Sequence, residues 1–150
     1  MNIQALEKML ERVGDLGLRR RIVTLLGYLD IRDDETILDC GCGEGFYSMA
    51  ISELYNADVT AFDWDASLLK MASGWIRKKE RIRFASGDIA RGLPFKDGSF
   101  DKIVFSEVLE HLNDDRHALL EVSRVLKRGG VVGLTVPNCN YPLLWDPLNW

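Results

Sequence analysis

A glycine-rich segment that begins with an acidic residue, Asp39-x-Gly41-x-Gly43-x-Gly45, has the residue types of a loop that wraps a ligand. Glycine has no Cβ, so three glycines at alternate positions let the main chain turn sharply and approach a bound molecule. Asp39 adds a carboxylate at the start of this loop. That carboxylate would repel a pyrophosphate but suits a ligand that carries an ammonium group. The segment therefore favours a cationic, nucleoside-like ligand.

The main alternative for such a loop is a dinucleotide-binding turn. That turn needs Gly-x-Gly-x-x-Gly, which sets a pyrophosphate on the N-terminus of the following helix. Counted from Gly41, the position of the last glycine is occupied by Phe46. The spacing thus predicts that NAD does not bind.

A second carboxylate, Asp63, directly follows the apolar run Val59–Phe62. In nucleotide-binding α/β folds, an acidic residue at the end of the second strand accepts hydrogen bonds from both hydroxyls of a ribose. Trp64 beside it offers a flat surface for an adenine ring. The alternative is that Asp65 caps the next helix and that Asp63 merely lies in the same turn. We expect the ribose role for Asp63 and leave the cap at Asp65 open.

Two further polar segments follow later apolar runs. Asp88 could accept a hydrogen bond from an adenine amino group, with the Ile89 amide meeting a ring nitrogen, although Gly-Asp alone is also a common turn dipeptide. Ser106 ends another apolar run.

His111 is a weak candidate for a general base, because histidine titrates near neutral pH. The alternative is that His111 begins a helix and has no catalytic role.

Short apolar runs and helical stretches alternate along the chain, and these elements must position the polar residues. This alternation predicts an α/β fold with a doubly wound, mostly parallel sheet, which binds ligands outside the carboxyl ends of its strands. The expected strands are Thr36–Cys40, Asp58–Phe62, Arg81–Ala85, Lys102–Phe105 and Val131–Val136, and the expected helices between them are Phe46–Tyr55, Ala66–Lys79 and Asp114–Lys127.

Residues 1–30 have apolar positions at helical spacing that Gly14 interrupts. We expect two helices, Met1–Val13 and Asp15–Asp30, which could cover the site as a lid, and a core formed by residues 31–150. The run Arg19–Arg21 raises the question of phosphate binding. Three basic residues on a short helix usually form a solvated face, and we expect that here.

Composition narrows the classes of protein. The 150 residues, 47% of them apolar, fit one globular domain, and a net charge of −4 without a basic face argues against nucleic acid. No apolar run reaches the roughly 20 residues that span a bilayer. The charged N-terminus does not look like a secretion signal, so we expect a cytoplasmic protein. The three cysteines lack a second Cys/His pair at zinc spacing, so we expect reduced thiols and no metal.

Taken together, these motifs resemble the class I, Rossmann-like methyltransferases that use S-adenosylmethionine, and within them the methyltransferase type-11 group. The resemblance runs from about Thr36 to Asn138. It implies a cofactor site in which the methionine end, the ribose and the adenine are bound in turn. By position these residues are Asp39, Gly41, Gly43 and Gly45 for the methionine end, with Cys42 in the same loop, Asp63 for the ribose, Trp64, Asp88 and Ile89 for the adenine, and Ser106 on the side of the methyl donor.

The resemblance implies transfer of a methyl group to a small-molecule or lipid-like acceptor, and it names neither the acceptor nor the atom methylated. The alternative is a non-catalytic S-adenosylmethionine-binding subunit that stabilises or regulates a partner. A complete class I fold has two further strands after the fifth. We therefore expect a C-terminally truncated chain, or else a short form whose edge is covered by its tail, by a second copy in a homodimer or by another subunit.

Overall fold

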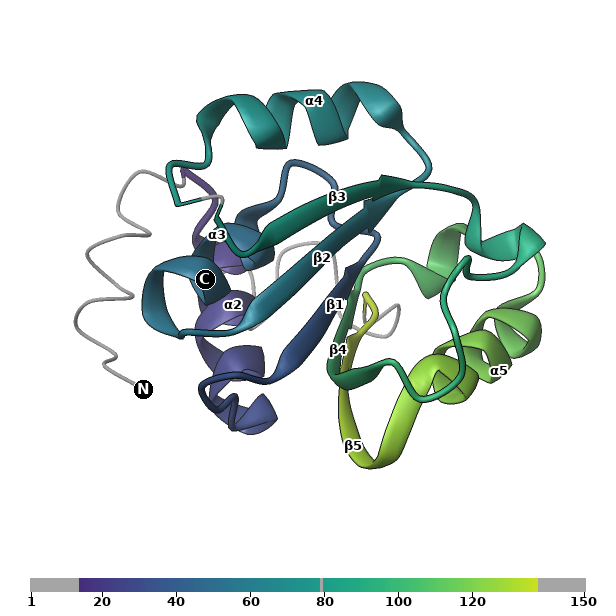
Figure 1. Cartoon of the computed structure of the whole chain (residues 1–150). Helices are drawn as coiled ribbons and strands as arrows, with labels where there is room; N and C mark the ends of the chain where they lie inside the picture. Colours follow the sequence, from purple (N-terminus) through teal and green to yellow (C-terminus); the bar gives the residue numbers. More distant parts are fainter. Residues whose placement is uncertain (1–13, 79, 138–150) are drawn as a thin grey trace.

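The computed structural model describes residues 14–78 and 80–137. Its centre is a five-stranded sheet in the order β3-β2-β1-β4-β5, with every neighbouring pair parallel (Figure 1). The strand order changes direction between β1 and β4, which confirms the doubly wound α/β fold. The strands are β1 Thr36–Cys40, β2 Asp58–Asp63, β3 Ile82–Ser86, β4 Phe100–Ser106 and β5 Leu126–Thr135.

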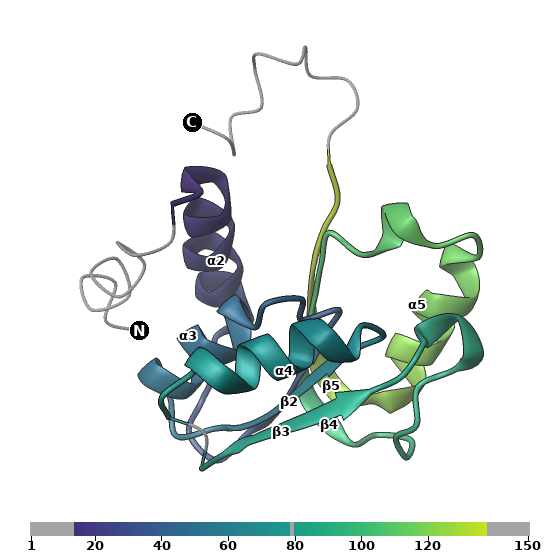
Figure 2. The same ribbon diagram turned by 90° about the horizontal axis from the view of Figure 1, so that it is seen from above.

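Helices cover both faces of this sheet. Figure 2 shows α5 on the side away from α2 and α3. The 3-10 turns η1 and η2 lie in the connections before and after β4. The bounds are α2 Leu16–Leu29, α3 Phe46–Leu54, α4 Ala66–Trp75, η1 Ile89–Arg91, η2 Leu109–His111 and α5 Asp115–Val125. Among the described residues, no helix is long and apolar enough to cross a membrane.

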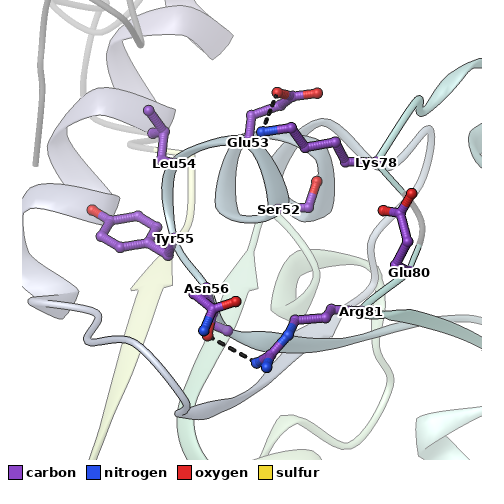
Figure 3. Close-up of a pocket in the computed structure, with 9 residues that line it drawn as sticks. Ser52, Glu53, Leu54, Tyr55, Asn56, Lys78, Glu80 and Arg81 are labelled. Carbon is purple, nitrogen blue, oxygen red and sulfur yellow. Dashed lines mark hydrogen bonds and ion pairs between the residues drawn. The ribbon is translucent and has the colours of Figure 1, made fainter.

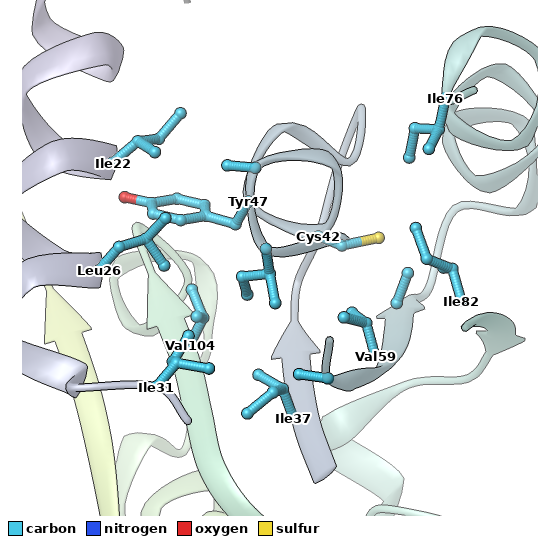
Figure 4. Close-up of a cluster of buried hydrophobic side chains, with 14 of the residues drawn as sticks. Ile22, Leu26, Ile31, Ile37, Cys42, Tyr47, Val59, Ile76, Ile82 and Val104 are labelled. Carbon is cyan, nitrogen blue, oxygen red and sulfur yellow. The ribbon is translucent and has the colours of Figure 1, made fainter. Parts of the chain in front are cut away.

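Two apolar clusters form the core, one on each face, because successive side chains of a strand point to opposite sides. Ile37 of β1 belongs to the cluster under α2, α3 and α4, whereas Leu38 belongs to the cluster under α5. Figure 4 shows the first cluster, with Tyr47 of α3 lying against Ile22 and Leu26 of α2. The inner strands β1 and β2 are therefore mostly buried on both sides, and the ligand-binding surface is left to the strand ends.

Helix α2 begins after Asp15, whose side chain accepts a hydrogen bond from the Leu18 amide. Its apolar side packs on β5. A Cβ at Gly133 would lie 2.7 Å from Leu25 and 3.2 Å from Leu29, so only glycine lets the helix approach this closely. This helix matches the one expected at 15–30. The helix expected at 1–13 lies outside the described residues, and the division at residue 30 and the lid stay predictions.

Several expected boundaries were wrong. Helix α4 ends at Trp75 rather than Lys79, because Ile76 turns to an extended conformation and buries its side chain in the core. Strand β5 begins at Leu126, five residues before the expected start at Val131, and the helix before it is correspondingly shorter. The two glycines at 129 and 130 resemble a turn, but they lie in an irregular stretch of the strand where the pairing with β4 shifts.

Candidate cofactor-binding site

The glycine loop joins the end of β1 to the start of α3. Gly41, Gly43 and Gly45 all have left-handed φ angles, of 77°, 51° and 80°, which strain other residues. A Cβ at Gly41 would clash with Val108, and one at Gly45 would lie 2.9 Å from Ala72. A Cβ at Gly43 would meet nothing within 4 Å. The outer glycines therefore let the loop pack against its neighbours, and the middle one leaves an open surface.

Asp63, at the end of β2, is tied to this loop. Its Oδ2 accepts a hydrogen bond of 2.8 Å from the Gly43 amide, and its Oδ1 accepts one of 2.9 Å from the Asp65 amide. The residue is 6% exposed. Each carboxylate oxygen can accept more than one hydrogen bond, so both retain capacity for a ligand hydroxyl. The link between Asp63 and Gly43 was not expected from the sequence, although neighbouring parallel strands bring these two strand ends together.

Asp39 lies behind the loop, where it is 1% exposed. Its Oδ2 accepts hydrogen bonds from the Ser48 amide at 2.9 Å and from the Ser48 hydroxyl at 2.6 Å. Burial raises the pKa of Asp39 to about 6, although the bonds from Ser48 act in the opposite direction. Asp39 thus anchors the first turn of α3 to β1. Its expected contact with the methionine end of a cofactor stays a prediction.

The thiol of Cys42, in the same loop, is buried and forms no disulfide, as is true of Cys40. Burial and nearby carboxylates raise the pKa of both thiols, so both stay protonated at neutral pH. The third cysteine, Cys139, lies outside the described residues.

A chain of hydroxyl groups connects the ends of α3, β4 and β5. The Tyr47 hydroxyl lies 3.1 Å from Ser106 Oγ, and Ser106 Oγ lies 2.7 Å from Thr135 Oγ1. Thr135 Oγ1 in turn donates a bond of 2.9 Å to Glu107 Oε1. An ionised carboxylate only accepts, so each hydroxyl must donate toward Glu107. Ser106 then has a lone pair, but no proton, to offer a ligand.

Glu107 directly follows β4 and has a left-handed φ of 56°, which is uncommon for a residue with a side chain. Its amide donates to the Thr135 carbonyl at 2.9 Å, and this bond holds the strained conformation in place. Backbone strain of this kind is concentrated at functional sites. Sequence motifs did not single out Glu107, Tyr47 or Thr135, because these residues become neighbours only in the folded sheet.

On the expected adenine side, Trp64 is 76% exposed beside Asp63. The side chain of Asp65 accepts a bond of 2.8 Å from the Ser67 amide, which confirms its role as the cap of α4. Asp88 caps the 3-10 turn η1 in the same way, through the Ala90 amide at 2.9 Å. The side chain of Ile89 is buried in the cluster under α5. The roles expected for Trp64, Asp88 and Ile89 toward adenine stay predictions.

His111, the weak candidate for a base, lies at the end of η2. Its side chain is 76% exposed, and its Nε2 lies 4.0 Å from Glu110 Oε1. The described structure gives it no hydrogen bond to the glycine loop or to the hydroxyl chain. His111 is therefore not gathered with the other site residues, and its role stays a prediction.

A cavity of about 390 Å³ lies at the opposite, amino edge of the sheet (Figure 3). It is lined by the end of α3 and by the residues that precede β2 and β3. Lys78 pairs with Glu53 at 3.2 Å, and Arg81 donates to the Asn56 carbonyl at 3.0 Å. Since the glycine loop and Asp63 lie at the carboxyl edge, this cavity is not part of the candidate site.

Comparison with known families places this arrangement in a class. The methyltransferase domain family matches residues 38–134, and the chain belongs to that family. The match confirms the resemblance drawn from the motifs, and with it the S-adenosylmethionine-dependent class of methyltransferase.

Particular relatives agree with this assignment. The chain is 34% identical over 126 residues to the uncharacterized methyltransferase YcgJ of Bacillus subtilis (strain 168), which covers 83% of this chain and 47% of the relative. It is 33% identical over 116 residues to a demethylmenaquinone methyltransferase of Staphylococcus aureus, covering 76% of this chain and 46% of the relative. The chain thus spans about half the length of the curated relatives it matches.

Solved structures show the same fold. The crystal structure of Bacillus YcgJ superposes with a TM-score of 0.65 at 32% identity, over 71% of this chain and 46% of that one. The [4+2]-cyclase SpnF superposes with a TM-score of 0.73 at 24% identity, over 79% of this chain and 44% of that one, and shows the fold alone. Because this fold carries more than one chemistry, the function must be argued from the site.

Proposed function

We propose that this chain binds S-adenosylmethionine at the carboxyl edge of its sheet and takes part in methyl transfer to a small-molecule or lipid-like acceptor. The observation that carries the proposal is the bond between the Gly43 amide and Asp63. It places a carboxylate directly beside the open middle of the glycine loop, which follows β1, a strand that borders the change in strand order. A nucleoside fits this arrangement, because its ribose hydroxyls can donate to the carboxylate.

The charges at this edge fit the cofactor. S-adenosylmethionine carries a positive sulfonium and an ammonium group, and the edge holds the carboxylates of Asp63 and Glu107, with Asp39 buried behind the glycine loop. Asp63 would accept hydrogen bonds from the ribose, and Trp64 would cover the adenine. The lone pair that remains on Ser106 would accept from the ammonium group. No group of three metal-ligating side chains occurs in the described residues, and the proposed reaction uses none.

When bound, the cofactor supplies a methyl group that the sulfonium makes electrophilic. The contribution of the protein is then to hold the acceptor in line and to exclude water, which can be worth roughly 7–11 kcal/mol when the reacting atoms are well aligned. The hydroxyl chain from Tyr47 to Glu107 would help to hold the strand ends in place, because each of its hydroxyl groups donates to the next member. An oxygen or nitrogen acceptor also needs a base, and His111 is the candidate that the sequence offers.

The acceptor class is supported by the demethylmenaquinone methyltransferase among the relatives, whose name points to a quinone substrate for that protein. We infer a related small or lipid-like acceptor for this chain. Its cytoplasmic location and its pairing as a homodimer stay predictions. A non-catalytic subunit would use the same cofactor site, so turnover, and not binding, separates the two functions.

Calorimetry of the 150-residue chain with S-adenosylmethionine, S-adenosylhomocysteine and NAD tests the cofactor. We expect both adenosyl ligands to bind and NAD to give no heat. Binding of NAD without a response to S-adenosylhomocysteine would overturn the proposal. Incubation with methyl-labelled S-adenosylmethionine and a fractionated cell extract then tests the reaction. We expect label in the lipid or small-molecule fraction, whereas cofactor binding without any labelled product would favour the non-catalytic subunit.

A further inference from the structure

We propose that Arg21 of α2 binds the carboxylate of the cofactor's methionine end, an inference that rests on the S-adenosylmethionine site proposed above. Arg21 is half-buried, and its Nε is fully buried without a hydrogen-bond partner among the described residues. Its guanidinium forms no ion pair in the part of the chain that the structure describes. A buried N–H donor without a partner is costly, and an anion bound beside this half-buried guanidinium would offset that cost.

This position corrects the expectation of a solvated face for residues 19–21. Arg20 is exposed, as expected, but Arg21 lies on the side of α2 that faces the sheet. Residues four apart share one face of a helix, so Arg21 continues the line of Leu25 and Leu29, which pack on Gly133 of β5. The sequence pattern did not predict the buried position of Arg21, because consecutive residues of a helix point in different directions and the run was treated as one face.

The same line brings Arg21 to the carboxyl edge of the sheet. Helix α2 ends just before β1 begins, so its first turns lie toward the ends of the strands (Figure 2). Arg21 precedes Leu25 by about 6 Å of helix, and Thr135 lies about 7 Å beyond Gly133 along β5. Arg21 is therefore level with Thr135, the residue that joins the hydroxyl chain to Glu107.

Electrostatics supports this placement independently. Burial raises the pKa of Tyr47 to about 12, while the charge of Arg21 acts to lower it and that of Glu107 to raise it. Arg21 and Glu107 thus both lie within electrostatic reach of the Tyr47 hydroxyl. Glu107 does not supply the missing partner of Arg21, because no ion pair joins the two side chains among the described residues.

The chemistry fits one end of the proposed ligand. An amino-acid end carries an ammonium and a carboxylate on the same carbon, so its site needs an acceptor and a cation close together. Ser106 supplies a lone pair, and Arg21 supplies the cation. A guanidinium is well suited to the second task because its planar donors match both oxygens of a carboxylate.

Two ligands that differ only in this carboxylate test the proposal: S-adenosylmethionine and decarboxylated S-adenosylmethionine. Both are titrated calorimetrically into the 150-residue chain and into its Arg21→Met variant, with thermal melts to verify folding. We expect Arg21→Met to weaken binding of S-adenosylmethionine at least tenfold and binding of the decarboxylated ligand less than threefold. Arg21→Lys, which keeps the charge but loses the planar donors, should give an intermediate loss for S-adenosylmethionine.

Arg32→Met is the matched control. Arg32 lies at the amino edge, where its exposed guanidinium is 3.6 Å from Asp30, and its removal should change neither affinity. Equal losses for both ligands in Arg21→Met would assign Arg21 a purely structural role and overturn the proposal, as would no loss at all. If the unaltered chain binds neither ligand, the proposed function itself falls. If it binds S-adenosylmethionine but Arg21→Met behaves as the unaltered chain does, only the role of Arg21 falls.

Discussion

Asp63 accepts one amide from the glycine loop and one from the turn after β2, so removal of its carboxylate frees two sheltered N–H groups at once. We expect Asp63→Ala to weaken binding of S-adenosylhomocysteine more than tenfold, because each hydrogen bond to a charged group is worth roughly 1.5–3 kcal/mol. The free energy of unfolding should also fall, by about 1–3 kcal/mol. Calorimetry and urea unfolding measure the two effects separately.

Glu53→Ala is the control for this prediction. Glu53 lies at the amino edge, and among the described residues its one ion pair is with the exposed Lys78, at 3.2 Å. Exposed ion pairs contribute little to stability, so the variant should bind S-adenosylhomocysteine within twofold of the unaltered chain. Equal losses of affinity in both variants would remove the ribose assignment of Asp63.

Asp39 makes stability depend on pH in an unusual direction. Burial raises its pKa to about 6 from the ordinary 3.8, so the folded chain holds this proton more tightly than the unfolded chain does. Its contribution to stability is therefore complete below about pH 4 and is lost as the pH rises to about 6, by about 3 kcal/mol at most. Protonated Asp39 fits its site, and ionised Asp39 destabilises it.

Asp39→Asn keeps an oxygen acceptor for Ser48 but cannot ionise. We expect its melting temperature, relative to that of the unaltered chain, to rise between pH 4 and pH 7. Thermal melts of both proteins at four pH values in this range test the prediction. A difference that stays constant with pH would show that Asp39 does not titrate there.

At the scale of elements, Arg124 of α5 secures the connection between η1 and β4. Its guanidinium donates to the carbonyls of Leu93 and Phe95, each at 2.8 Å, and pairs with Glu121 at 2.7 Å and Asp97 at 2.8 Å. We expect Arg124→Met to lower the free energy of unfolding by about 2–4 kcal/mol, because two sheltered carbonyls lose their donor. Urea unfolding at pH 7 measures this loss.

The loss of stability in Arg124→Met should become smaller at acidic pH. Hydrogen bonds from Arg124 lower the pKa of Glu121 to about 2, so the stability gained from this pair is present above about pH 4.5 and disappears as the pH falls toward 2. Arg91→Met serves as the control. The exposed Arg91 forms a long ion pair, with its Nε 3.6 Å from Asp88 Oδ2, so the variant should change the free energy of unfolding by less than about 0.5 kcal/mol. A comparable loss in both variants would show that Arg124 acts merely as a surface charge.

Some elements could be predicted closely and others could not. Strands β1 and β2 match their expected ranges within one residue, because each is an apolar run with polar residues at its ends. The start of β5 was missed because its glycine pair follows a helix and is locally indistinguishable from a turn. The end of α4 was missed because a buried contact of Ile76, and not a local breaker, ends the helix.

At the scale of the whole molecule, the same distinction applies to the site. The glycine loop and Asp63 could be predicted because their spacing is local and each follows a recognisable strand. The hydroxyl chain and Arg21 could not, because they join α2, α3, β4 and β5, and no short pattern records which side chains meet at the edge of a sheet. The bonds between these elements are a property of the assembled topology.

The contact between Gly41 and Val108 bears on how the protein forms during synthesis. The glycine loop takes its shape against a segment that follows β4, and β1 is held at its start by the bond from the Thr36 amide to Asp101. Partners this distant in the chain form slowly, because a long loop must close first. A nascent chain on the ribosome therefore cannot complete the loop until Val108 has emerged. The glycine loop, whose motif is local in the sequence, therefore depends on a segment much further along the chain before it can hold a ligand.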